Sequence, residues 1–118
     1  EKGQFCKKLL EQVGIGKINA GTSVLTWDEV IHSLKKHAPL KEVIDQSREF
    51  LRFPNLVFLD ADQKVIEKAE EMFIKYNLKP RDAIHCATAI HLGIKEIISD
   101  DSDFDKVKEI KRIDPMNV

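Results

Sequence analysis

The stretch KPRDAIHCATA, residues 79–89, decides which fold this chain can adopt. Pro80 suits the first position of a helix, because its missing N–H would be unpaired there in any case. The residues that follow are apolar or small on nearly every face, so we expect this helix to be buried. Asp82 stands in the first turn, just after the basic residues Lys79 and Arg81. An acidic residue in the first turn of a buried helix indicates a carboxylate with a functional role.

Strand and helix patterns alternate on both sides of this helix. Apolar runs predict strands over residues 18–24, 56–59, 94–98 and 110–113. Helical spacing of apolar residues predicts helices that end near residue 14 and that cover residues 26–39, 40–53, 62–76 and 80–93, with a short helical turn at 104–107. Strands separated by helices imply crossover connections and a parallel sheet. We therefore expect one α/β domain over residues 1–118, with three α/β/α layers around a parallel central sheet.

Composition narrows the class of protein further. The 118 residues include 19 basic and 20 acidic side chains, so a dominant polybasic surface is absent. Cys6 and Cys86 fall at apolar helical positions and form neither a disulfide framework nor a zinc pattern, which favours a reducing cytoplasm. No apolar run approaches the roughly 18 residues that a membrane span needs. The composition therefore predicts a cytoplasmic protein that does not span a membrane.

Acidic residues recur where a predicted strand is followed by a helix. Glu29 comes after the strand at 18–24, and Asp101 and Asp103 come after the strand at 94–98. Ligand sites in α/β sheets form beyond the carboxyl ends of the strands, so we expect these two groups to share that edge. Asp82 joins them if its helix runs back against the direction of the strands.

Each acid alone also has a purely structural interpretation. Thr26 and Glu29 have the spacing of a capping box, in which the glutamate returns to the threonine N–H. Asp82 in a first turn complements the helix dipole by about 0.3–1 kcal/mol. Asp101 and Asp103 fit an ordinary loop with a helix cap.

The combination of acids favours a metal site. Several carboxylates crowded at one edge repel one another, and a divalent cation removes that repulsion. Oxygen ligands of this kind suit Mg²⁺ or Mn²⁺, and zinc is disfavoured because neither cysteine nor a histidine pair belongs to the group. Such sites most often serve phosphoryl chemistry.

Three segments, TSVLTWDEV at 22–30, PRDAIHCATA at 80–89 and SDDSDF at 99–104, resemble the PIN domain. The likeness covers nearly the whole chain and is strongest to the small prokaryotic PIN proteins that include VapC toxins. It implies an Mg²⁺- or Mn²⁺-dependent endoribonuclease that hydrolyses RNA, with Glu29, Asp82, Asp101 and Asp103 as metal-binding and catalytic residues. Asp100 stands where many relatives have Asn or Arg, so it ranks below Asp101. The resemblance also implies a homodimer and an antitoxin partner.

The chain departs from the family pattern at its start. The family begins with a strand that ends in an Asp-Thr-Asn-type motif, whose aspartate is the central metal ligand, and nothing here matches it. We expect a segment of about 15 residues to be missing, because a parallel sheet without its middle strand would expose a long apolar seam. Residues 1–118 alone are therefore expected to bind metal and cleave RNA weakly or not at all.

Three residues beside the acids are candidates for contact with substrate. Lys79 and Arg81 could hold a backbone phosphate, although solvated surface charge is the favoured interpretation of either one. His85 lies one turn after Asp82 and could orient that acid or touch a phosphate, or could be an ordinary hydrogen-bonded histidine. The alternative function is a non-catalytic PIN-like module that binds RNA or protein and uses its acids only as helix caps. A further metal phosphoesterase fold would need a nucleophilic aspartate motif, which these residues lack.

Overall fold

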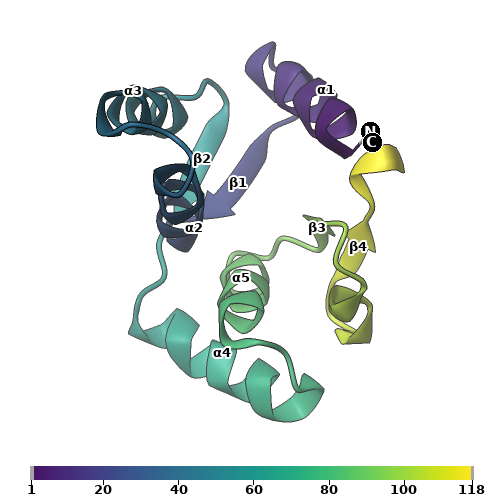
Figure 1. Ribbon diagram of the computed structural model, residues 1–118. Coiled ribbons are helices and arrows are strands. Elements are labelled where there is room, and N and C mark those ends of the chain that lie inside the picture. Colours follow the sequence, from purple (N-terminus) through teal and green to yellow (C-terminus); the bar gives the residue numbers. More distant parts are fainter. Residues whose placement is uncertain (1, 118) are drawn as a thin grey trace.

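The computed structural model describes the backbone of residues 2–117 and the side chains of residues 8–117. Helices and strands alternate along most of this part of the chain (Figure 1). The helices and strands are α1 (Lys2–Gly14), β1 (Ala20–Ser23), α2 (Leu25–Lys35), α3 (Leu40–Leu51), β2 (Leu56–Leu59), α4 (Gln63–Tyr76), α5 (Pro80–His91), β3 (Glu96–Ile98) and β4 (Lys111–Ile113), with short 3₁₀ helices η1 (Ser102–Lys106) and η2 (Pro115–Asn117). The predicted order of elements is confirmed, and most boundaries differ from the prediction by one to a few residues.

The strands form two parallel pairs rather than one central sheet. β1 pairs with β2, with Gly21 opposite Val57, and β3 pairs with β4, with Ile97 opposite Arg112. The prediction of a PIN-like α/β fold with parallel strands is confirmed, and within the described residues those strands form two two-stranded sheets. In Figure 1 the two pairs stand apart, with β1 and β3 on the sides that face each other. Among residues 2–117, no strand lies between these two edges to join them.

A cleft of about 1140 Å³ separates the two pairs. Its lining is largely apolar, and it comes from α1, β1, α5 and β3. The hydrogen bonds within each strand pair show which backbone groups face the cleft. The N–H groups of Ala20 and Val24 donate to β2 and its flank, at Asn55 O and Leu59 O. Because backbone groups alternate sides along a strand, the N–H groups of Gly21 and Ser23 point the opposite way, toward the cleft.

The same reasoning applies to β3. Lys95 O accepts from Lys111 N–H, and Ser99 N–H donates to Ile113 O, so the odd-numbered backbone groups face β4. The N–H groups of Glu96 and Ile98 consequently face the cleft. Both facing edges therefore offer unused strand-pairing groups to the same apolar space.

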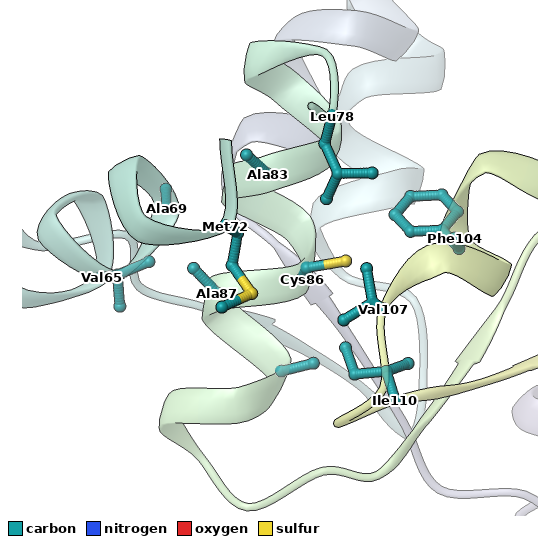
Figure 2. Packing of buried hydrophobic residues seen from close by; sticks show 11 residues of the cluster. Val65, Ala69, Met72, Leu78, Ala83, Cys86, Ala87, Phe104, Val107 and Ile110 are labelled. Carbon is teal, nitrogen blue, oxygen red and sulfur yellow. The ribbon is translucent and has the colours of Figure 1, made fainter. Parts of the chain in front are cut away.

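The core lies on the other side of α5, where α4 packs along it (Figure 2). α4 begins at Asp62, whose Oδ1 accepts the Val65 N–H at 3.0 Å, and ends at Asn77 in the left-handed conformation. Small residues on α5, among them Ala83 and Ala87, leave room for Met72 of α4 to pack against the helix. The prediction that the 80–89 segment is buried is confirmed: its buried residues are Ala83, Cys86, Ala87, Thr88 and Ala89.

Two further predictions concern the cysteines and membranes. Cys86 is fully buried, and burial raises the pKa of its thiol to about 12, so it behaves as a small core residue. Cys6 lies outside the described side chains. Within residues 2–117, every helix is too short or too polar to cross a bilayer.

Candidate metal centre

Three carboxylates converge where the start of α5 meets the loop after β3. Asp82 lies in the first turn of α5, Asp101 caps η1, and Asp103 lies in the first turn of η1. One carboxylate oxygen from each lies within 4.8 Å of the other two, and all three residues are half-buried. Asp100 does not belong to this group among the described residues. The residues that the sequence predicted to act together, Asp82, Asp101 and Asp103, are thus brought together by the fold.

Asp82 is positioned by a rigid helix. Pro80 occupies the start of α5, and the N-cap Lys79 makes no side-chain capping bond. The pKa of Asp82 is raised above its ordinary value, first by burial and then by the charge of Asp101, while His85 and Lys79 oppose the shift. A raised carboxyl pKa means that ionised Asp82 lacks enough positive charge around it, which is the deficit that a bound cation removes.

Asp101 and Asp103 are held by the loop and by η1. Asp101 donates its N–H to Ser99 Oγ at 3.1 Å, and its Oδ1 accepts the Asp103 N–H at 2.9 Å. The predicted capping role is therefore real for Asp101, although capping occupies only one of its two oxygens. Lys106 Nζ lies 3.7 Å from Asp103 Oδ1 and partly offsets that charge. Capping and ligation are compatible here, because a carboxylate accepts several bonds.

Glu29 lies on α2 and borders the same cleft, but it does not belong to the cluster of three aspartates. It lines the cleft together with Asp82 and Asp101, and its charge contributes to the raised pKa of Asp82. The capping-box interpretation does not hold, because α2 begins at Leu25 and its N-cap, Val24, makes no side-chain bond. Glu29 Oε1 instead lies 2.6 Å from His85 Nε2.

Basic residues line the solvent side of the site. Lys79 and Arg81 border a second hollow of about 470 Å³, together with Glu29, Asp82 and Asp101. Arg81 Nη2 lies 3.7 Å from Asp28 Oδ2, and both side chains are exposed. The cationic groups of Lys79 and Arg81 thus lie near the site, and Arg81 contacts Asp28.

Sequence reasoning missed two contacts that shape the site. His85 was expected to act on Asp82 or a phosphate, but its hydrogen-bond partner is Glu29, which is 56 positions away in the sequence. Thr22 Oγ1 donates to Thr26 Oγ1 at 2.8 Å and ties the end of β1 to the start of α2. The spacing of Asp82 and His85 indicates a shared helix face, but no local pattern identifies a partner on another helix.

The donor set fits a hard divalent cation. In an octahedral Mg²⁺ site, oxygen ligands lie about 3.0 Å apart when adjacent and about 4.2 Å apart when opposite, since each bond measures about 2.1 Å. The three aspartate oxygens, within 4.8 Å of one another, lie near enough for side-chain rotations to bring them around one ion. All donors are carboxylate oxygens, as Mg²⁺ and Mn²⁺ prefer.

Comparison with known proteins relates this chain to a protein family. The PIN domain model matches residues 1–110. Ribonuclease VapC2 of Methanocaldococcus jannaschii is 28% identical over 120 residues, which cover 92% of this chain and 80% of that protein. Ribonuclease VapC6 of the same organism is 36% identical over 73 residues, which cover 62% of this chain and 48% of that protein.

A solved structure shares the fold. A toxin-antitoxin complex from Klebsiella pneumoniae contains a chain that superposes with a TM-score of 0.73 at 23% sequence identity, covering 98% of this chain and 87% of that chain. The architecture is therefore shared well beyond close sequence similarity. Because the family model spans nearly the whole sequence, this chain belongs to the PIN domain family.

Proposed function

We propose that this chain carries the catalytic site of a metal-dependent endoribonuclease that hydrolyses RNA phosphodiester bonds. The observation that carries the proposal is the convergence of three aspartate oxygens within 4.8 Å, with Glu29 lining the same cleft. Relatives named Ribonuclease VapC2 and Ribonuclease VapC6 support the reaction class.

Each acidic residue has a distinct part in this proposal. Asp82, Asp101 and Asp103 would hold Mg²⁺ or Mn²⁺, and Glu29 would complete the acidic wall from the opposite helix. When bound, such a cation activates water and stabilises the negative charge that develops on the phosphate. Partial burial of Asp82 reduces the screening of its charge by bulk water, so the acids act more strongly on a cation placed among them than exposed carboxylates would.

The basic residues would bind the substrate rather than the metal. Lys79 and Arg81 border the hollow that opens beside the acids, where they would pair with phosphates flanking the scissile bond. Arg81 would exchange its exposed contact with Asp28 for a phosphate at little cost, because surface ion pairs contribute about 0–1 kcal/mol.

We further propose that the protein acts in the cytoplasm as a toxin with a protein antitoxin, and that it forms a homodimer. The solved structure with the same fold is a toxin-antitoxin complex, which supports the antitoxin part of this proposal. Co-expression with the product of a small neighbouring gene tests it: the partner is expected to co-purify and to suppress cleavage. Cleavage at an undiminished rate in a co-purified complex would contradict the antitoxin role.

Asp82→Asn tests the proposed function most simply. The assay uses RNA with Mn²⁺ or Mg²⁺ and the complete protein, meaning this chain with any residues that its gene encodes before Glu1. Cleavage is expected to fall on the order of 100-fold or more, because even residues behind the ligands contribute about 10–100-fold to metal sites. EDTA is expected to abolish cleavage by the unmodified protein.

Asp60→Asn, an exposed aspartate away from the cluster, is the matched control and is expected to cleave normally. Cleavage retained by Asp82→Asn would contradict the proposal. RNA binding without cleavage under any metal would instead favour the non-catalytic binding module.

A further inference from the structure

We propose that His85 is a positioning residue, which holds the Glu29 carboxylate against the three-aspartate cluster from its place on α5. This inference rests on the proposed function and names a residue that acts through Glu29 rather than on the RNA. Its starting point is the 2.6 Å separation between His85 Nε2 and Glu29 Oε1, which is typical of a strong hydrogen bond to a carboxylate.

The two partners differ in how firmly the fold holds them. His85 lies on α5, whose neighbouring residues Ala83, Cys86 and Ala87 are in the core. Glu29 lies on α2, and none of the residues of that helix is buried. The hydrogen bond therefore ties a side chain on a helix without buried residues to a helix whose inner face packs in the core.

The bond also determines where Glu29 can point. A glutamate side chain has three rotatable bonds, and ordering it carries an entropic cost that a specific partner must offset. The contact is partly shielded, because the His85 side chain is 19% exposed and that of Glu29 is 35% exposed. His85 stands one turn after Asp82 on the same helix, so a carboxylate bound to its ring is kept next to the cluster.

The chemistry of the imidazole suits this task. An ionised glutamate only accepts hydrogen bonds, so Nε2 must carry the proton and donate it. Groups that hydrogen-bond to metal-ligating residues and orient them generally contribute about 10–100-fold to metal affinity. Removing the donor frees Glu29 without removing any oxygen from the cluster, which separates positioning from ligation.

Two substitutions in the complete protein test the role. His85→Leu removes the donor, and His85→Gln retains an N–H at nearly the position of Nε2. The first readout is the Mn²⁺ dissociation constant, measured by calorimetry in the absence of RNA, and the second is the Mn²⁺ concentration that gives half-maximal cleavage. Both are expected to rise about 10-fold in His85→Leu and to stay within about 3-fold of the original in His85→Gln.

A double substitution shows whether His85 acts through Glu29. In a Glu29→Ala background, His85→Leu is expected to change the dissociation constant by less than about 2-fold, because neighbouring residues that act together are not additive. His91→Leu, which changes an exposed histidine on the same helix, is the matched control and is expected to match the original protein. Thermal melting of every variant reports whether it is folded.

The outcomes separate this inference from the proposed function. The positioning role would be overturned if His85→Leu had the same Mn²⁺ dissociation constant as the original protein and reached half-maximal cleavage at the same Mn²⁺ concentration. In that case, metal-dependent cleavage by the original protein would still support the proposed function. An equally large additional loss in the Glu29→Ala background would also overturn it. If His85→Leu does not fold, a loss of Mn²⁺ affinity greater than about 10-fold in folded His85→Gln, the size expected for complete loss of the contact, would overturn it as well. A protein that neither binds Mn²⁺ nor cleaves RNA would overturn the function and the inference together.

Discussion

Asp82 is the residue at which stability and function oppose each other. Burial and the charge of Asp101 raise its pKa, so the folded chain binds a proton at this carboxyl more readily than the unfolded chain does. The free energy of unfolding therefore falls as the pH rises from the ordinary aspartate value through the raised pKa. At neutral pH the ionised carboxylate destabilises the metal-free protein. A residue that destabilises its own fold in this way is typical of a functional site.

Asp82→Asn is accordingly expected to raise the melting temperature of the metal-free protein at neutral pH. The increase should amount to a few degrees at most, because the carboxyl is partly exposed and solvent screens its interactions. The difference should shrink as the pH is lowered through the raised pKa, where Asp82 itself becomes neutral. Differential scanning calorimetry in EDTA measures both effects. A lower melting temperature for Asp82→Asn than for the original protein would show that the ionised carboxylate stabilises the fold.

At the scale of elements, α5 could be predicted from the sequence and the sheet could not. Pro80 at the start and small apolar residues on nearly every face are local features, and they predict a buried helix over these residues. Strand pairing depends on segments far apart in the chain, such as Gly21 and Val57, and local patterns do not reveal whether two edges meet. The contact between Glu29 and His85 has the same long-range character. The acids themselves could be predicted, because Glu29, Asp101 and Asp103 follow strands and Asp82 lies in the first turn of a buried helix.

The close packing of α4 on α5 predicts that Ala87 cannot be enlarged. Ala87 is fully buried, and Met72 packs beside it (Figure 2). Ala87→Leu is expected to lower the free energy of unfolding by about 1–3 kcal/mol, because extra methylenes in a filled core force neighbouring side chains aside. Urea unfolding provides the measurement. His91→Leu, an exposed position on the same helix, is expected to change stability by less than about 0.5 kcal/mol. Equal stability of the two variants would contradict the packing described here.

At the scale of the whole molecule, a largely apolar cleft lies between the two strand pairs. The cleft is lined largely by apolar side chains and is bordered by strand edges whose outward N–H groups pair with neither β2 nor β4. Asp82 and Asp101 lie on the same cleft, where α5 and the loop after β3 border it. Anything seated between β1 and β3 would therefore lie next to the three-aspartate cluster.

Hydrogen exchange in residues 1–118 tests the geometry of these edges. The amides of Gly21, Ser23, Glu96 and Ile98 face the cleft and are expected to exchange rapidly. The amides of Val24 and Ser99 donate to Leu59 O and Ile113 O and are expected to exchange more slowly. Nuclear magnetic resonance resolves both sets in one experiment. Comparable protection of the two sets would contradict the description of β1 and β3 as open edges.

The central claim is that Asp82, Asp101 and Asp103 together bind one divalent cation. Paramagnetic broadening by Mn²⁺ tests it directly, because the ion broadens only the resonances of nuclei close to it. In the complete protein, substoichiometric Mn²⁺ is expected to broaden the amide signals at the start of α5 and in η1 first, and Asp82→Asn is expected to abolish this pattern. Broadening spread over unrelated surface carboxylates, or unchanged in Asp82→Asn, would contradict the claim.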